Sequence, residues 1–122
     1  MIGYVTLGTN DFEASSQFYD ALLALCDAKR LMEFEGFILW GTSPDKAGLA
    51  LAKPFDENPA SVGNGVMAAI HVTSKDMVNT IHCKALELGG ENEGDPGPRG
   101  DGFYAGYFRD PQGNKLNVFY FG

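Results

Sequence analysis

Basic residues are scarce in this sequence, and the few that are present are scattered along it. The chain holds nine Lys and Arg against sixteen Asp and Glu, which gives a formal net charge of −7 at pH 7. Nucleic acids and anionic membrane surfaces both attract proteins through a basic patch or stripe. We therefore expect no nucleic acid and no membrane among the partners of this protein.

Long apolar runs and cysteine motifs are also missing. No stretch approaches the roughly 18 apolar residues of a membrane-spanning helix, and the first residues lack the charged and then apolar pattern of a secretory signal. Cys26 and Cys83 follow no metal-binding or redox spacing, so we expect two free thiols in a reducing compartment. A cytoplasmic protein is the simplest interpretation. A length of 122 residues with 44% hydrophobic residues suits a single domain, 1–122.

The chain nearly repeats itself 63 residues further on. An apolar strand at Tyr4–Leu7 is followed by Asn10 and then by an acid three positions later, and Met67–Ile70 is followed in the same way by Thr73. A polar residue with an acid three positions on is the capping box that begins a helix. The repeat predicts two copies of one strand–helix unit, with Asn10 and Thr73 as N-caps. Paired modules leave a cleft between them, and function is expected there.

Turn signals and apolar runs complete each copy. After the first helix the sequence predicts a hairpin turned at Glu35–Gly36 and a short strand at 49–52. After the second helix it predicts a loop over 94–102 and a terminal hairpin turned at 110–113. Each copy is therefore expected to contain a strand, a helix and three further strands.

The predicted fold class is α+β, with two tandem βαβββ modules whose mixed β-sheets form a cup-shaped, barrel-like structure. The first module covers about 1–53 and the second about 66–122. The segment of about 54–65, which holds two prolines and two glycines, is expected to link them.

Two segments of the sequence point to a known family. Residues 6–22 (TLGTNDFEASSQFYDAL) and 103–116 (FYAGYFRDPQGNKL) resemble the vicinal-oxygen-chelate superfamily, which includes glyoxalase I, bleomycin- and fosfomycin-resistance proteins and extradiol dioxygenases. The resemblance extends over essentially the whole chain. It implies a cup that holds a divalent metal, with His and Glu ligands from the first and last strands of each module.

The positions that match those ligands carry other residues here. Tyr4 and Met67 stand where the family usually has His, and Asn117 stands where it usually has Glu. The short strand at 48–52, which often supplies a further ligand, has no acid, His or Cys. A phenol, a thioether and an amide are poor ligands for a hard divalent cation, so we expect no tightly held metal and no metal cofactor.

Strand periodicity places a set of candidate ligand-binding residues on one pocket face. This mixture of aromatic, thioether and amide groups is typical of a small-molecule pocket. Because none of these side chains is an acid, Lys or Arg, a neutral or aromatic ligand is favoured, although Met67 and Phe119 could equally fill the cup. The candidates are Tyr4, Thr6, Met67, His71, Asn117 and Phe119.

Three polar residues have competing interpretations. His71 can be interpreted in three ways: as a strand-end residue with local hydrogen bonds, as a ligand-binding group, or as a shifted metal ligand. His82 lies inside the second helix and is expected to be structural, with its ring beside the core. Arg109 precedes Asp110 and is expected to form an ion pair in the turn rather than to bind an anion.

The first functional hypothesis is a glyoxalase/bleomycin-resistance-like protein that binds a small molecule without a catalytic metal. The alternative is a divergent metal-dependent lyase or dioxygenase that holds a metal weakly through His71 and Asn117. A further alternative is a non-catalytic interaction protein. Whether the protein is an enzyme stays open, with a non-catalytic role favoured. The resemblance and the exposed strand edges of short modules also suggest a homodimer.

The substitutions Tyr4→His, Met67→His and Asn117→Glu together test the assigned ligand positions. We expect the triple variant to gain affinity for Ni, Zn or Mn, measured as metal per chain by elemental mass spectrometry after desalting. A triple variant that folds and still binds no metal would show that these strands are wrongly aligned with the family.

Overall fold

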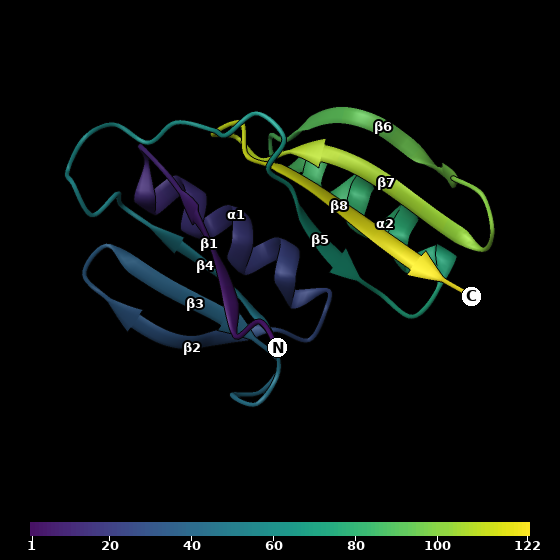
Figure 1. Cartoon of the computed structure of the whole chain (residues 1–122), viewed down its shortest axis with the longest axis horizontal. Coiled ribbons are helices and arrows are strands. Elements are labelled where there is room, and N and C mark those ends of the chain that lie inside the picture. The colour runs from purple at the N-terminus through teal and green to yellow at the C-terminus, as the bar shows by residue number, and fades with distance from the viewer. The chain divides into compact units, whose positions relative to one another are not determined.

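The computed structural model describes all 122 residues and divides into two units, Met1–Val62 and Gly63–Gly122. Each unit contains one α-helix and a sheet of four strands (Figure 1). Met1–Val62 is unit 1 and Gly63–Gly122 is unit 2.

Unit 1 is a βαβββ module. Its helix α1 (Phe12–Ala24) follows the first strand and precedes the other three. The order in the sheet is β1-β4-β3-β2, in which β1 pairs with β4 in parallel and the other pairs are antiparallel. The strands are β1 (Tyr4–Gly8), β2 (Lys29–Phe34), β3 (Phe37–Gly41) and β4 (Gly48–Ala52).

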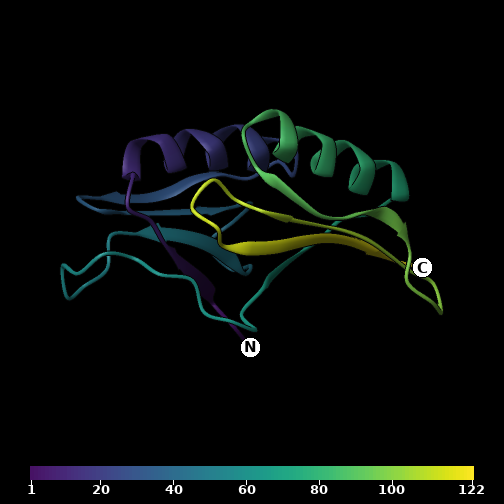
Figure 2. The ribbon, with the colours of Figure 1, turned by 90° about the horizontal axis from the view of Figure 1, so that it is seen from above.

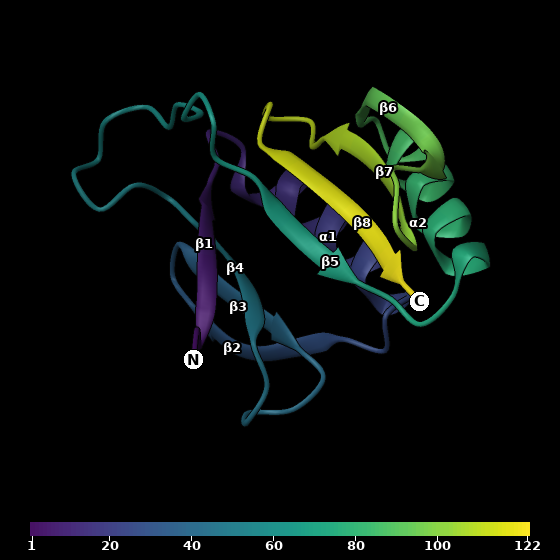
Figure 3. The same ribbon diagram turned by 45° about the vertical axis from the view of Figure 1, so that its right-hand side comes forward.

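Unit 2 repeats this topology. Its helix is α2 (Lys75–Glu87), and its sheet has the order β5-β8-β7-β6, with β5 parallel to β8, as can be followed in Figure 3. The strands are β5 (Ala68–His71), β6 (Glu91–Pro98), β7 (Phe103–Arg109) and β8 (Lys115–Phe121).

The internal repeat and the predicted α+β fold class are confirmed. α1 and α2 each span 13 residues, and their ends are offset by the same 63 positions as the sequence repeat. Strand order and strand directions also correspond between the two sheets. The two modules are therefore two copies of one structural unit.

The predicted loop over 94–102 is wrong for most of its length, because β6 runs through it to Pro98. β6 is an edge strand whose pairing with β7 is interrupted twice, between Asn92 and Gly94 and between Gly94 and Gly97. An edge strand with bulges tolerates glycine and proline, which hide the alternating pattern of an ordinary strand. The actual turn is Arg99–Gly102, where Gly100, Asp101 and Gly102 have positive φ angles.

The predicted helix caps are each wrong by one residue. The N-cap of α1 is Asp11, whose side chain accepts a hydrogen bond from the Ala14 N–H, and the N-cap of α2 is Ser74, which accepts one from the Met77 N–H. The amide of Asn10 instead makes two hydrogen bonds to the backbone of Ala60. The acids of the supposed capping boxes lie in the first turn, where they complement the helix dipole.

In unit 1 the helix is tied to its sheet by a polar cluster at the edge of an apolar core. Asp20 of α1 accepts a bidentate pair of hydrogen bonds from Arg30, at 2.8 and 2.6 Å, and a third from Trp40 Nε1 at 2.9 Å. The Arg30 hydrogen bonds, supported by the one from Trp40, hold the pKa of the Asp20 carboxyl below its ordinary value although partial burial opposes the shift. Trp40 also packs against Tyr19, and both rings are buried.

In unit 2 the corresponding contact is made by a histidine. His82 is buried, with Nε2 3.0 Å from the Tyr107 carbonyl and 3.1 Å from Asn92 Oδ1. A Cβ at Gly106 would lie 3.0 Å from the imidazole, so glycine at this position leaves room for the ring. These contacts support a structural role for His82.

Neither helix has the length and hydrophobicity needed to cross a membrane. Both cysteines are unpaired: Cys83 is exposed, whereas Cys26 is half-buried and burial raises the pKa of its thiol.

The revised cap of α2 can be tested by a pair of alanine substitutions. Ser74→Ala removes the acceptor of the Met77 N–H and is expected to lower the free energy of unfolding by about 1 kcal/mol. Thr73→Ala, one residue earlier, is the matched control and is expected to change it by less than about 0.5 kcal/mol. Urea denaturation measures both changes. A larger loss of unfolding free energy in Thr73→Ala than in Ser74→Ala would show that Thr73 is the N-cap, as expected from the sequence.

Candidate ligand-binding site

The sheet of unit 2 has one face against α2 and one face away from it (Figure 2). His82 and Asn79 of α2 contact Gly106 and Tyr104 of β7, which fixes that side of the sheet as the helix side. Side chains alternate along strands, so the residues of opposite parity form the helix-free face. The helix-free face of unit 2 is defined here by Met67, Ala69, His71, Phe103, Ala105, Tyr107, Arg109, Lys115, Asn117, Phe119 and Phe121.

One end of the helix-free face is aromatic. His71 pairs with Phe119 in the β5–β8 register, and their rings stack with centroids 5.0 Å apart and an interplanar angle of 23°. Phe119 also stacks on Phe103 of β7, at 5.3 Å and 26°. Phe119 therefore lies in a row between His71 and Phe103, and another planar group can meet this row edge-on or cover one of its end rings.

The centre of the face holds an unsatisfied polar atom. Asn117 is only 2% exposed, and its Oδ1 is buried without a hydrogen-bond partner. Its neighbours in the sheet are Ala69 on β5 and Tyr107 on β7. A buried carbonyl oxygen without a donor costs about 1–3 kcal/mol, so it favours a ligand or water that brings an N–H or O–H to this position.

The other end of the face is cationic. The Tyr107 ring has the Arg99 guanidinium 5.4 Å from its centroid and the Lys115 ammonium 5.7 Å from it. Neither cation forms an ion pair. The ion pair of unit 2 joins Arg109 to Glu93. Glu93 lies close enough to both Arg109 and Lys115 that their charges lower the pKa of its carboxyl, with the Arg109 hydrogen bond as the larger cause.

The expected ion pair between Arg109 and Asp110 is not formed. Arg109 binds Glu93 and donates to the Gly113 carbonyl at 2.9 Å. Asp110 is buried and accepts hydrogen bonds from the turn that follows it, including those from the backbone and side chain of Asn114. The carboxylate is therefore a turn cap and is satisfied by neutral N–H donors rather than by Arg109.

Four of the six predicted site residues lie together on this face: Met67 just before β5, His71, Asn117 and Phe119. Tyr4 and Thr6 belong to unit 1, where they share the face of β1 that points away from α1. Tyr4 is 52% exposed, and its ring meets Phe37 edge-on at 6.1 Å.

The residues of this chain do not fit the divalent metal that the fold implies. The three inherited positions supply the neutral oxygens of the Tyr4 phenol and the Asn117 amide and the soft thioether of Met67, and none of them is a carboxylate or an imidazole. No three His, Cys, Asp or Glu side chains of the chain come together as a metal-binding group. His71 stacks on Phe119 and has no acidic or imidazole partner for a shared ion.

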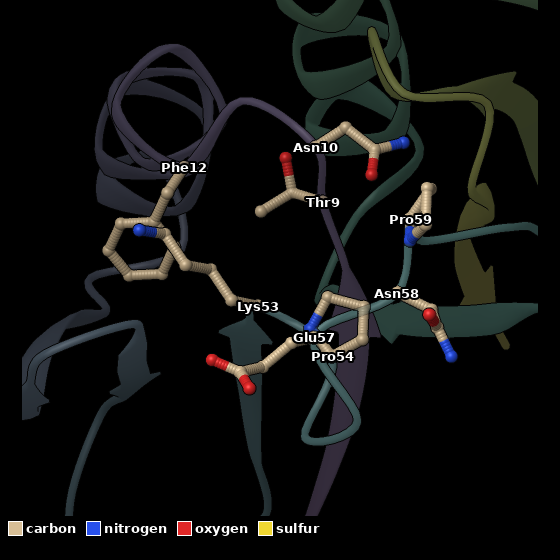
Figure 4. A pocket seen from close by; sticks show the side chains of 8 residues that line it. All are labelled: Thr9, Asn10, Phe12, Lys53, Pro54, Glu57, Asn58 and Pro59. Carbon is tan, nitrogen blue, oxygen red and sulfur yellow. The ribbon is translucent and has the colours of Figure 1, made fainter.

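A second feature is a surface cavity of about 350 Å³ within unit 1. It lies between the start of α1 and the segment after β4, and Figure 4 shows Phe12 and Lys53 on one side of it and Asn58 and Pro59 on the other. Its buried hydroxyl, that of Thr9, lies 2.6 Å from Ser15 Oγ and also accepts from the backbone of Asp11, so no unsatisfied buried group faces the cavity. None of the six predicted residues lines it.

Sequence reasoning missed the cationic end of the helix-free face. Lys115 has the same parity as Asn117 and Phe119 in β8, so strand periodicity alone could have placed it beside them. Arg99 carried no such signal, because it comes from the end of a bulged strand and folds back over Gly94 and Gly97.

The family model described as Glyoxalase/Bleomycin resistance protein/Dioxygenase superfamily matches residues 1–118. The chain belongs to this superfamily, which confirms the resemblance of its two sequence segments. No curated protein is significantly similar to it in sequence.

Several solved structures share the fold. A glyoxalase/bleomycin resistance protein from Albidiferax ferrireducens T118 is 30% identical, with a TM-score of 0.90 over 100% of this chain and 99% of that chain. A glyoxalase/bleomycin resistance protein/dioxygenase family enzyme from Burkholderia phytofirmans PsJN is 17% identical, with a TM-score of 0.80 over 98% of both chains. A lactoylglutathione lyase from Agrobacterium tumefaciens is 18% identical, with a TM-score of 0.70 over 98% of this chain and 92% of that chain.

Two buried asparagines of the terminal hairpin give a stability test of the unsatisfied oxygen. Asn117→Leu removes an amide oxygen that has no partner and is expected to leave the free energy of unfolding unchanged or to raise it by up to about 2 kcal/mol. Asn114→Leu removes a donor to Asp110 and is expected to lower it by about 1–3 kcal/mol. Equal losses in both variants, measured by urea denaturation, would show that the Asn117 oxygen is satisfied in solution.

Proposed function

We propose that this protein binds a small molecule on the helix-free face of unit 2 and does so without a catalytic metal. The observation that carries the proposal is the unpartnered Oδ1 of Asn117, buried in the middle of a face that has stacked rings at one end. In a folded protein nearly every buried polar atom has a partner, so an exception next to an aromatic row favours a ligand as the missing donor.

Each part of the face supplies one element of recognition. The row of His71, Phe119 and Phe103 offers aromatic contact area, and Asn117 fixes the orientation of the ligand through one directional hydrogen bond. Met67, which precedes β5 and is 41% exposed, adds a flexible side chain that can adjust to the shape of the ligand. Tyr4 and Thr6 extend the proposal to the equivalent face of unit 1.

Binding is favoured over the metal-dependent lyase and dioxygenase reactions because of the donor set. Those reactions use a divalent ion to polarise or activate oxygen atoms of the substrate. Tyr4, Met67 and Asn117 together offer no carboxylate, imidazole or thiolate to hold that ion. The likeness to a lactoylglutathione lyase, at 18% identity, therefore supports a shared fold and not a shared reaction.

A homodimer in the cytoplasm completes the proposal. β1 and β2 are the edge strands of one sheet and β5 and β6 those of the other, and unpaired edges favour association with a second chain. Multi-angle light scattering at several protein concentrations tests the dimer, and a constant monomer mass would reject it.

Metal loading and ligand screening together test the main proposal. Protein exposed to Ni, Zn, Mn and Fe(II) and then desalted is expected to retain close to no metal per chain by elemental mass spectrometry. In a thermal-shift screen of planar compounds, compounds that raise the melting temperature of the wild type are expected to lose the effect in Asn117→Leu and Phe119→Ala.

Asn58→Ala, which alters the cavity of unit 1, is the matched control and is expected to keep the ligand-induced shifts. One tightly bound metal ion per chain would contradict the metal-free proposal. Shifts that disappear in Asn58→Ala and persist in Asn117→Leu would place the site in unit 1 instead.

A further inference from the structure

The cationic end of the helix-free face narrows the class of ligand, if the proposed binding function holds. The six predicted site residues include no acid, Lys or Arg, so the sequence alone favours a neutral or aromatic ligand. Lys115 lies two residues before Asn117 on the same face, and Arg99 reaches that face from the end of β6. We propose that unit 2 binds an aromatic anion, with its ring against the row of His71, Phe119 and Phe103, an N–H or O–H donor at Asn117 and its carboxylate or phosphate between Arg99 and Lys115.

Arg99 is held in place by specific contacts. Its Nη2 donates to the Asp95 carbonyl at 2.7 Å and its guanidinium lies against the Tyr107 ring. A Cβ at Gly97 would lie 3.2 Å from Arg99 Nη1, and one at Gly94 would lie 3.4 Å from Nη2. Two glycines in β6 thus leave the space that the guanidinium occupies, so the cation lies against the Tyr107 ring although Arg99 is an exposed residue.

The pairing of the charged groups at this end leaves two cations without a bonded carboxylate. Glu93 is bound by Arg109 although it also lies near Lys115, and the Asp95 carboxylate accepts from Asn92. Glu91, opposite Arg109 in the register, is exposed and forms no ion pair. Arg99 and Lys115 also have no carboxylate within ion-pair distance. In a protein with a net charge of −7, two unpaired cations on one tyrosine ring are a local exception to the charge of the chain.

The spacing along β8 sets the order of groups in the ligand. Lys115, Asn117 and Phe119 are alternate residues of one strand, so Lys115 and Phe119 are separated by about 13 Å of backbone, with Asn117 midway. The Lys115 ammonium lies 5.7 Å from the centroid of Tyr107, the neighbour of Asn117, so this cation reaches back toward the middle of the span. A ligand that meets all three needs a ring, a donor and an anionic group in that order, as in an N-aroyl amino acid.

A matched set of probes separates the three contacts by isothermal titration calorimetry. N-benzoylglycine carries the ring, the N–H and the carboxylate. N-benzoylglycinamide removes the charge, benzoyloxyacetate replaces the N–H by oxygen, and benzamidomethylphosphonate replaces the carboxylate by a phosphate-like group. We expect N-benzoylglycine to bind about tenfold more tightly than either of the first two analogues.

The protein variants address the same contacts. Lys115→Gln and Arg99→Gln are each expected to weaken N-benzoylglycine about tenfold and to leave N-benzoylglycinamide unchanged. Glu93→Gln, which frees Arg109, is expected to tighten N-benzoylglycine, and Lys29→Gln in unit 1 is the neutral control. Raising the salt concentration should weaken the anion and not the amide.

The outcomes distinguish the proposed anion subsite from the proposed binding function. If the phosphonate binds more tightly than the carboxylate, the subsite is assigned to a phosphate group; the reverse assigns it to a carboxylate, and either supports an anion subsite. Equal affinity for N-benzoylglycine and its amide would overturn the anion subsite and leave the binding function standing. No binding of any probe at its highest soluble concentration would overturn the aromatic-anion ligand, and the thermal-shift screen then decides the binding function separately.

Discussion

The parallel pairing of β5 with β8 is the constraint on which the proposed site depends. Its register sets Ala69 beside Asn117 and His71 beside Phe119, and the antiparallel pairing with β7 adds Tyr107 and Ala105 to the same rows. A shift of one residue in either pairing would send Asn117 and Phe119 to the helix side. The buried apolar residues Leu116 and Val118, which alternate with them and are fully buried, oppose that shift.

The two modules keep one scaffold and differ on their helix-free faces. In both, a 13-residue helix packs on a sheet with the same strand order. The helix-free face of unit 1 carries Tyr4, Phe37 and Leu39, while that of unit 2 carries Asn117, Lys115 and stacked rings. The side of each sheet that packs on the helix maintains the fold, so the residues of the helix-free face can differ between the two units without loss of the fold.

Much of the fold could be predicted from the sequence because its signals are local. The 63-residue repeat, the hairpin at Glu35–Gly36 and the turn at 110–113 depend on neighbouring residues, and the structure contains all of them. The caps were misplaced by one residue because Asn10 bonds to Ala60, which is 50 positions away. β6 was missed because its bulges and glycines remove the period of two.

The candidate site could be predicted only in part, because its contacts depend on residues that are distant in the sequence. The parity of Asn117 and Phe119 follows from their places in one strand, but the absence of a partner for Asn117 Oδ1 depends on every side chain around it. The same holds for Arg99, whose position depends on space left by Gly94 and Gly97. A sequence predicts which face a residue occupies more readily than what that residue contacts there.

The most direct test of the central claim is a nuclear magnetic resonance titration of isotope-labelled protein with N-benzoylglycine. Chemical-shift changes are expected to concentrate on the side-chain carbonyl of Asn117 and on His71, Phe119 and Lys115, with the resonances of Thr9 and Lys53 unchanged. Changes confined to the cavity of unit 1, or no saturable change in unit 2, would contradict the account.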